Sequence, residues 1–267
     1  MSRIVEKYAE LPRPLRKPLW QWWHRTMNKY DSENAANFMN YGYESLNGDP
    51  RLKLVNGDET DRYCIQLYDH VVNRADLKGK KVLEVGSGRG GGASYITRYF
   101  KPESYVGMDI SESSISFCNN HYKVDGLSFK HGIAEKLPFD DNTFDFVVNV
   151  ESARCYSDMQ AFFNEVYRVL KDDGKLLIAD MIYPKELEEF HARIERSKFK
   201  KQHETNISKN VVKALEKDSE RREHLIDTKA PKMLRKSFKT FAGTLGTSRY
   251  NNFANGIFQY WSFVLVK

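Results

Sequence analysis

The sequence predicts a doubly wound α/β fold with a mostly parallel sheet. Between residues 80 and 182, short apolar runs alternate with amphipathic helical patterns, and a glycine-rich turn follows the first run. Strand–helix–strand units of this length require parallel pairing and right-handed crossovers. The 267 residues, of which 40% are hydrophobic, suffice for one such core with additions at either end.

The core elements are predicted from apolar periodicity and from turn and capping residues. Ser111 is a candidate helix N-cap, and Asp173-Gly174 turns the chain into the last of these strands. In order, the predicted elements are strand 82–86, helix 90–100, strand 104–110, helix 111–121, strand 144–150, helix 159–170 and strand 175–182.

Beyond Pro184 the pattern changes to long helical stretches rich in Lys, Glu and Arg. Alternating aromatic and β-branched residues return at 238–245 and 257–266, on either side of a polar turn. These two runs predict a C-terminal β-hairpin that completes the sheet. The helical stretch before it is then an insertion placed to cover the carboxyl edge of the parallel strands.

Charge and composition exclude several classes of protein. The net charge of +6 equals the excess in residues 185–240, where 16 Lys and Arg are interspersed with 10 acids, so we expect a solvated helical face and no nucleic-acid partner. No run approaches the ~18 apolar residues of a spanning helix, and the N-terminus carries charges where a signal peptide is apolar. The three cysteines lack metal-ligand or disulfide spacing, so we expect a cytoplasmic protein without a metal.

The most informative segment is the glycine-rich turn from Glu84 to Gly92. Gly86, Ser87, Gly88 and Gly90 lie between a strand and a helix, where bare backbone and helix amides can approach an anionic group. Asp109 ends the second strand, 23 residues after Gly86, where a carboxylate accepts from ribose hydroxyls. The turn and the acid together predict a bound nucleoside, either NAD(P) or S-adenosylmethionine.

Four successive blocks favour S-adenosylmethionine: EVGSGRGGG, GMDIS, LPFDDNTFDFVVNVESA and EVYRVLKDDGKLLIAD. In order and spacing they resemble the motifs of class I S-adenosylmethionine-dependent methyltransferases, which implies a Rossmann-like fold. More narrowly, YxGxDxS, the CY pair of NVESARCY and the tail FAGTLGTSRY resemble the phthiotriol/phenolphthiotriol dimycocerosate methyltransferase type. That resemblance implies O-methylation of a hydroxyl on a small or lipid-like natural product.

The resemblance also implies a role for each matching residue. The glycines line the methionine end of the cofactor, with Glu84 supporting it indirectly, and Asp109 holds the ribose. Ile133 stands where the family usually has an acid, which leaves adenine to be held by packing and backbone. The cofactor-binding residues implied are Tyr41, Glu84, Gly86, Ser87, Gly88, Gly90, Asp109, Ile110, Ile133, Ala134, Glu135 and Asn149.

The candidate catalytic residues are Glu151, Tyr156 and Tyr43. Glu151 ends a buried strand and either acts on the acceptor or supports the cofactor and pairs with Arg154. Arg154 replaces a histidine of the narrower relatives and cannot take a proton at neutral pH. Tyr41 and Tyr43 either close over the cationic sulfonium or only pack on the core.

Several alternatives remain open at this point. The acceptor atom can be oxygen, nitrogen or carbon, and an NAD-linked oxidoreductase or a non-catalytic cofactor-binding protein are the remote alternatives. A stripe with Leu19, Trp22, Trp23 and Met27 predicts a helix at 18–30 that touches a membrane, covers the active site or joins a neighbouring subunit of a homo-oligomer. The predicted segments are an N-terminal arm or lid 1–75, a cofactor-binding core 76–183, a helical cap insertion 184–236 and C-terminal strands 237–267.

Overall fold

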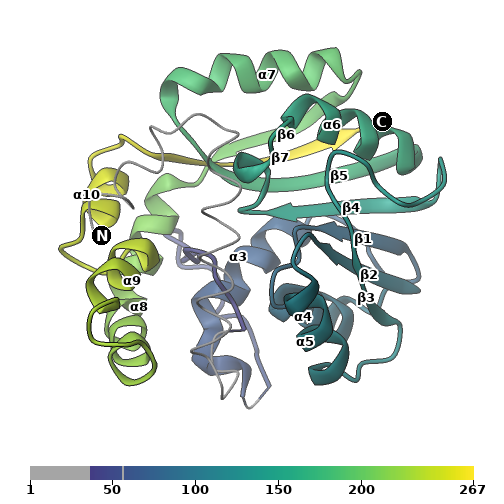
Figure 1. Cartoon of the computed structure of the whole chain (residues 1–267). Coiled ribbons are helices and arrows are strands. Elements are labelled where there is room, and N and C mark those ends of the chain that lie inside the picture. The colour runs from purple at the N-terminus through teal and green to yellow at the C-terminus, as the bar shows by residue number, and fades with distance from the viewer. Residues whose placement is uncertain (1–36, 56) are drawn as a thin grey trace.

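The molecule is built on a seven-stranded sheet, and the computed structural model describes residues 37–55 and 57–267 (Figure 1). The strands are β1 (Lys81–Val85), β2 (Ser104–Asp109), β3 (Leu127–His131), β4 (Phe144–Val150), β5 (Leu170–Ile182), β6 (Lys200–Asn206) and β7 (Gln259–Val266). Their order in the sheet is β3-β2-β1-β4-β5-β7-β6. The first five are parallel, and β7 runs antiparallel to both β5 and β6. The predicted doubly wound, mostly parallel fold is confirmed.

Helices cover both faces of the sheet. The covering helices are α3 (Arg62–Val72), α4 (Gly91–Phe100), α5 (Glu112–His121), α6 (Met159–Val169) and α7 (Leu187–Arg196). The first three lie on one face, and α6 and α7 lie on the other (Figure 1). Because strand side chains alternate between faces, Val82 of β1 packs in the first core and its neighbour Leu83 in the second.

The remaining helices form a group beside the carboxyl ends of the parallel strands (Figure 1). They are α8 (Ser208–Lys229), α9 (Arg235–Ala242) and α10 (Ser248–Ala254), and we call them the cap. Arg222 of α8 joins the cap to the segment that precedes α3, since its Nη2 donates to the backbone oxygen of Asn40 at 3.1 Å. The same guanidinium pairs with Asp218 one turn earlier, which keeps the buried charge compensated.

Local signals place several element boundaries correctly. Ser111 caps α5, because its Oγ accepts from the backbone nitrogen of Ser114 at 3.3 Å. Gly90 precedes α4 with a φ of +78°, a left-handed conformation that glycine adopts without strain. The described residues also include three short 3-10 segments, η2 (Asp58–Asp61), η3 (Ala153–Cys155) and η4 (Pro184–Glu186).

The predicted C-terminal β-hairpin is wrong. Residues 238–245 belong mostly to helix α9, where Phe238 packs with Leu234 in a small apolar cluster and Gly243 ends the helix at a φ of +69°. The partner of β7 is instead β6, which lies within the insertion predicted to be helical. The sequence of β6, KKQHETN, is polar because β6 is an edge strand with largely exposed side chains, so it carries no apolar alternation. Strand β3, at the other edge, was also absent from the prediction.

The predicted helix at 18–30 lies outside the described residues. Within residues 37–55 and 57–267, no helix combines the length and the apolar character needed to cross a membrane.

Candidate active site

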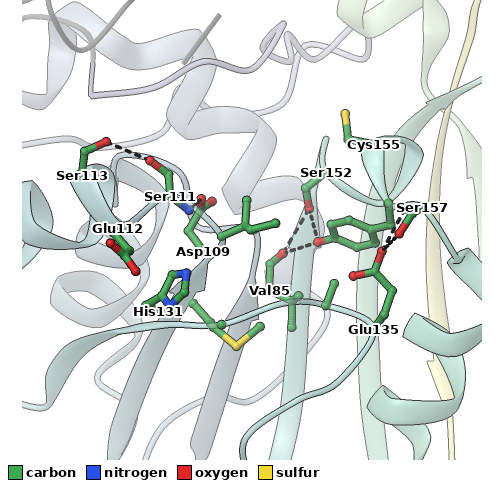
Figure 2. A pocket seen from close by; sticks show the side chains of 16 residues that line it. Val85, Asp109, Ser111, Glu112, Ser113, His131, Glu135, Ser152, Cys155 and Ser157 are labelled. Carbon is green, nitrogen blue, oxygen red and sulfur yellow. Dashed lines mark hydrogen bonds between the residues drawn. The ribbon is translucent and has the colours of Figure 1, made fainter. Parts of the chain in front are cut away.

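A cavity of about 610 Å³ opens at the carboxyl ends of β1, β2 and β4 (Figure 2). This is the edge where open parallel sheets bind ligands, at the point where the strand order reverses. Figure 2 shows Asp109, Ser111 and His131 on one side of the cavity and Ser152, Glu135 and Ser157 on the other. Its lining residues are Val85, Gly86, Met108, Asp109, Ile110, Ser111, Glu112, Ser113, His131, Gly132, Ala134, Glu135, Ser152, Cys155, Tyr156 and Ser157.

The glycine-rich turn contributes one residue, Gly86, to the cavity lining, while Ser87, Gly88 and Gly90 are not among the lining residues. The backbone nitrogens of Gly86 and Ser87 both donate to the oxygen of Met108, at 2.7 and 3.0 Å, which holds the turn against β2. Gly86 has a φ of +84°, and a Cβ atom there would lie 2.3 Å from Ser152 Oγ. Glycine is therefore required at this position by backbone conformation and by space.

Asp109 lies at the end of β2 and faces the same cavity. Its two carboxylate oxygens accept from the backbone nitrogens of Gly88 and Ser111, each at 2.9 Å. Asp109 therefore fixes the glycine turn and the start of α5 relative to each other. Its place in the cavity is the one that the sequence predicts for a ribose-binding acid.

Of the residues predicted to surround the adenine, Ile110, Ala134 and Glu135 line the cavity and Ile133 does not. Ile133 is 37% exposed and forms an isolated bridge with Lys136, so its side chain is outside the lining. Glu135 accepts from the nitrogen and the hydroxyl of Ser157, at 2.9 and 2.6 Å. Burial opposes ionisation, but these hydrogen bonds outweigh it and lower the pKa of Glu135 below its ordinary value.

Glu84 lies beneath the glycine turn and does not line the cavity. It is fully buried and accepts from the hydroxyls of Tyr68 and Tyr105, at 2.9 and 3.0 Å. Burial raises the pKa of its carboxyl to about 7, although both hydroxyls favour the charged form. Glu84 thus joins α3 to strands β1 and β2 and acts on the cavity only through the turn above it.

A second polar cluster closes the cavity at the end of β4. Asn149 Nδ2 donates to the oxygen of Val85 at 2.8 Å and to the hydroxyls of Ser152 and Tyr156, at 2.8 and 2.9 Å. Burial raises the pKa of the Tyr156 hydroxyl well above its ordinary value, which favours its protonated form. Asn149 and Tyr156 therefore hold the end of β1 against η3.

Glu151 is buried next to this cluster, but it is not part of the lining. Its Oε1 accepts from the backbone nitrogen of Tyr41 at 2.7 Å and from the hydroxyl of Tyr260 at 2.9 Å. Its Oε2 lies 3.7 Å from Arg154 Nη2. Burial raises the pKa of Glu151 to about 7, and the nearby Arg154 limits the increase. Both carboxylate oxygens are thus engaged by the protein itself.

Tyr41 and Tyr43, predicted either to close over the sulfonium or to pack on the core, both make packing contacts, with different partners. Tyr41 is buried, with its ring packed edge-on against Phe253 at 4.9 Å and Arg154 Cζ 6.0 Å from its centroid. Tyr43 stacks on His70 of α3, with ring centroids 4.3 Å apart, and neither tyrosine lines the cavity. Of the two alternatives given for Tyr43, this contact favours packing on the core over a role next to the sulfonium.

Several lining residues were not predicted from the sequence, among them His131, Ser152 and Cys155. His131 ends β3, a strand that the prediction lacked, so no signal marked it as lying beside Asp109. Ser152 and Cys155 lie in the segment that follows β4. The rule that ligands bind outside the carboxyl ends of parallel strands could have found them.

Residues in and directly beside the cavity fit the methionine and adenosine parts of S-adenosylmethionine. Ser87 Oγ and Asn149 Oδ1, which are buried beside the glycine turn, have no hydrogen-bond partner within the described part of the chain. Such orphaned polar atoms are costly unless a ligand or water satisfies them. Together with the carboxylate of Asp109 and the apolar surface of Ile110 and Ala134, they match a ligand with a polar tail, a ribose and a flat base.

Comparisons with known proteins agree with this geometry. Residues 83–178 match the family model described as a methyltransferase domain. The chain is 37% identical over 238 residues to the phthiotriol/phenolphthiotriol dimycocerosates methyltransferase of Mycobacterium tuberculosis, covering 88% of this chain and 87% of the relative. It is also 40% identical over 200 residues to the fatty-acid O-methyltransferase of Mycolicibacterium smegmatis, covering 74% and 72%.

Solved structures share the fold. The geranyl diphosphate C-methyltransferase of Streptomyces coelicolor superposes with a TM-score of 0.62 at 16% identity, covering 91% of this chain and 97% of that one. The cyclase SpnF superposes with a TM-score of 0.67 at 17% identity and covers 94% of both chains. Because a cyclase shares the fold, the reaction class rests on the sequence relatives, and these decide for S-adenosylmethionine over NAD(P). The chain therefore belongs to the S-adenosylmethionine-dependent methyltransferases.

Proposed function

We propose that this chain transfers the methyl group of S-adenosylmethionine to an oxygen atom of a lipid-like acceptor. Two relatives at 37% and 40% identity are named for lipids, and one of them is named an O-methyltransferase. The observation that carries the proposal is the cavity in which Asp109, at the end of β2, faces the segment that follows β4. This cavity supports a cofactor site at the carboxyl ends of the parallel strands. We propose that the acceptor reaches this site from the side on which the cap lies.

Several residues in and beside the cavity have a proposed task toward the cofactor. Asp109 binds the ribose hydroxyls, while Ile110 and Ala134 pack on the adenine. The turn at Gly86–Gly90, Ser87 Oγ and Asn149 Oδ1 hold the methionine end. S-adenosylmethionine, when bound, supplies a methyl group on a positively charged sulfur with a good leaving group.

The protein then has to align the acceptor and exclude water, since an in-line displacement gains most from orientation. Glu151 is a positioning residue in this proposal, because its carboxylate already binds Tyr41, Tyr260 and Arg154. Through these contacts, Glu151 joins the segment that precedes α3 to the segment that follows β4. Tyr156 serves the same purpose for Asn149 and Ser152.

The first test is calorimetric titration with S-adenosylhomocysteine and, separately, with NADH. Micromolar binding of S-adenosylhomocysteine alone is expected. Asp109→Ala should weaken that binding by about 10- to 100-fold, since it removes charge-assisted hydrogen bonds. Asp125→Ala, which removes an exposed acid, is the matched control and should bind as the parent protein does. Unchanged affinity in Asp109→Ala would reject the pocket assignment.

The acceptor is tested with labelled S-adenosylmethionine and a panel of hydroxylated lipids, fatty acids and polyketides. Products methylated on oxygen are expected, and the absence of product from every member would contradict the proposed function. Glu151→Gln separates the two roles considered for Glu151. A positioning role predicts similar losses in turnover and in cofactor affinity, whereas a loss confined to turnover would mean that Glu151 acts on the acceptor.

We also propose that residues 18–30 contact a membrane surface that holds the acceptor, in a cytoplasmic protein. The support is the apolar stripe containing Trp22 and Trp23 beside basic residues. Co-sedimentation with anionic vesicles should be lost when both tryptophans are changed to alanine, and retention would contradict this contact. Light scattering in the same buffer tests the predicted homo-oligomer.

A further inference from the structure

One peptide group in residues 37–41, which we call the strap, is held from both sides by buried charged side chains. It is the trans peptide between Asn40 and Tyr41. Its carbonyl oxygen accepts from Arg222 Nη2 at 3.1 Å, and its N–H donates to Glu151 Oε1 at 2.7 Å. Because the C=O and the N–H of a trans peptide point in opposite directions, Arg222 of the cap and Glu151 after β4 lie on opposite sides of the strap.

The surroundings strengthen both hydrogen bonds, and we call this arrangement the peptide clamp. The four residues that form it each expose less than a tenth of their surface: Asn40, Tyr41, Glu151 and Arg222. A guanidinium as donor and a carboxylate as acceptor make charge-assisted hydrogen bonds, which gain strength where water is excluded. The cation lies at the oxygen end of the peptide dipole and the carboxylate at its N–H end, so each polarises the peptide in favour of the other bond.

The guanidinium of Arg222 is oriented by a carboxylate that it shares with a neighbour. Asp218 pairs with Arg222 Nε at 2.7 Å and with Arg221 Nε at 2.6 Å. Asp218 therefore keeps a cationic partner when either arginine is removed. The Nη2 atom of Arg222 reaches the strap and lies 3.6 Å from Cys64 Sγ of α3. Arg222 thus joins the cap to the strap at the place where the strap meets α3.

The residues before the clamped peptide pack directly on the glycine-rich turn. A Cβ atom on Gly88 would lie 3.3 Å from Met39 Cε, and one on Gly91 would lie 2.6 Å from the backbone oxygen of Asn37. The ring of Phe38 comes within 2.8 Å of the same Cβ position on Gly91. The missing side chains of two glycines therefore let the strap lie against the turn.

We propose that Arg222 is a positioning residue for the cofactor: through the peptide clamp it holds the strap on the glycine-rich turn and closes the methionine end of the S-adenosylmethionine site. This inference rests on the proposed function, in which the turn at Gly86–Gly90 holds that end. Within the described part of the chain Arg222 is not a lining residue of the cavity, so it acts through the strap. The cap thereby contributes to cofactor affinity from a distance.

The position of the strap predicts which half of the cofactor is affected. The strap contacts the turn at Gly88 and Gly91, whereas Asp109, Ile110 and Ala134 line the part of the cavity proposed for adenosine. Loss of the clamp should therefore weaken ligands that carry the amino-acid end and spare those that lack it. A general loss of folding would weaken both kinds of ligand alike.

The test compares S-adenosylhomocysteine with 5′-methylthioadenosine, which has the adenosine and the sulfur but lacks the amino-acid end. Calorimetry is done at pH 8.5, where Glu151, with its pKa of about 7, is ionised. Arg222→Met should weaken binding of S-adenosylhomocysteine by about 10-fold, the value of one charge-assisted hydrogen bond, and leave the affinity for 5′-methylthioadenosine unchanged. An unchanged affinity for S-adenosylhomocysteine, or equal losses for the two ligands, would overturn the proposal.

Arg221→Met is the matched control. It removes the other arginine that pairs with Asp218, from the same helix, and the hydrogen bonds of Arg221 go to Asp218 and Asp61 and not to the strap. Both ligands should bind to this variant as they do to the parent protein. A loss like that of Arg222→Met would mean that α8 in general, and not the clamp, sets the affinity.

Two further variants test the clamp and the strap separately. Met39→Ala leaves the clamp intact and removes the contact with Gly88, so it too should weaken S-adenosylhomocysteine alone, by about 3-fold or more. Since Arg222 and Glu151 hold one peptide, the double variant Arg222→Met with Glu151→Gln should bind only slightly more weakly than the weaker of the two single variants. Full affinity in Met39→Ala, or losses that multiply in the double variant, would contradict the proposal.

Hydrogen exchange gives a readout that does not depend on activity. Peptides that span the strap should exchange their amide hydrogens about 10-fold faster in Arg222→Met than in the parent protein, while those of β1 are unchanged. S-adenosylhomocysteine should slow exchange of the strap in the parent protein. Equal exchange of the strap in the two proteins would show that Arg222 does not hold it.

The outcomes separate this inference from the proposed function. If S-adenosylhomocysteine binds equally well to the parent protein and to Arg222→Met, the inference fails and the proposed function stands. If S-adenosylhomocysteine does not bind to the parent protein, the proposed function itself fails.

Discussion

Removing the Tyr260 hydroxyl should destabilise the protein by an amount that depends on pH. The hydroxyl donates to Glu151 Oε1 at 2.9 Å, and both residues are buried, so water does not replace the lost donor in Tyr260→Phe. Burial raises the pKa of Glu151 to about 7 from an ordinary value of 4.5. The hydrogen bond therefore goes to an ionised group in alkaline solution and to a neutral group in mildly acidic solution.

The expected magnitude follows from this difference. A hydrogen bond to a charged group contributes about 1.5–3 kcal/mol, and one between neutral groups about 0.5–1.5 kcal/mol. Tyr260→Phe should thus lower the free energy of unfolding by about 2 kcal/mol near pH 8.5 and by about 1 kcal/mol near pH 5.5. The substitution also raises the pKa of Glu151 further, since a donor that favours the carboxylate is lost.

The direction of the pH dependence in the parent protein provides a check. Because the folded-state pKa of Glu151 exceeds its unfolded value, its contribution to stability is complete below pH 4.5 and is lost as the pH rises through about 7. Glu84, whose pKa is also raised to about 7 by burial, acts in the same direction. Glu151→Gln should remove one of these two contributions and leave the other.

Urea unfolding at both pH values, for the parent protein, Tyr260→Phe, Glu151→Gln and the double variant, measures all of these quantities. In the Glu151→Gln background the effect of Tyr260→Phe should be the same at both pH values, because the titrating group is absent. Equal losses at the two pH values in the parent background would refute the reasoning, and so would a pH-dependent loss that persists in Glu151→Gln.

Three further outcomes are expected. Gly86→Ala should lower the free energy of unfolding, measured in urea, by about 2–4 kcal/mol, because it combines a left-handed φ with a Cβ 2.3 Å from Ser152 Oγ. The control Gly48→Ala, with a φ of +70° and open space around it, should lower it by only about 1 kcal/mol. Similar losses in the two variants would contradict the steric reason. Burial lowers the pKa of His70 to about 4, so the free energy of unfolding should fall as the pH drops from about 6.5 toward 4. In His70→Gln the free energy of unfolding should depend less on pH in this range. An unchanged pH dependence in the variant would mean that His70 titrates normally. Leu83→Ala, at a fully buried position in the centre of β1, should lower the free energy of unfolding in urea by about 2–5 kcal/mol. A decrease below about 1 kcal/mol would argue against close packing around Leu83.

Several of the residues predicted from local sequence line the cavity. Gly86, Asp109 and Ile110 lie in the cavity because each follows directly from the end of a strand, and parallel strands bring their carboxyl ends to one edge. Ala134 and Glu135 were found through the same motif resemblance. Ile133, one residue away from them, faces outward, because the short turn closed by its bridge to Lys136 sets which side chains face inward.

The sequence by itself determined the order of the core strands and helices apart from β3, the glycine turn and the acid at the end of β2, since these depend on periodicity and on residues close in the chain. Only the tertiary structure decided that β6 pairs with β7, because an edge strand made of polar residues is stabilised by its partner and not by its own pattern. It also decided that Tyr41 and Tyr260 converge on Glu151, and that Arg249 lies buried beside Met181. These residues are 68 to 110 positions apart in the chain, and contacts of that range depend on how layers pack, which no local pattern encodes.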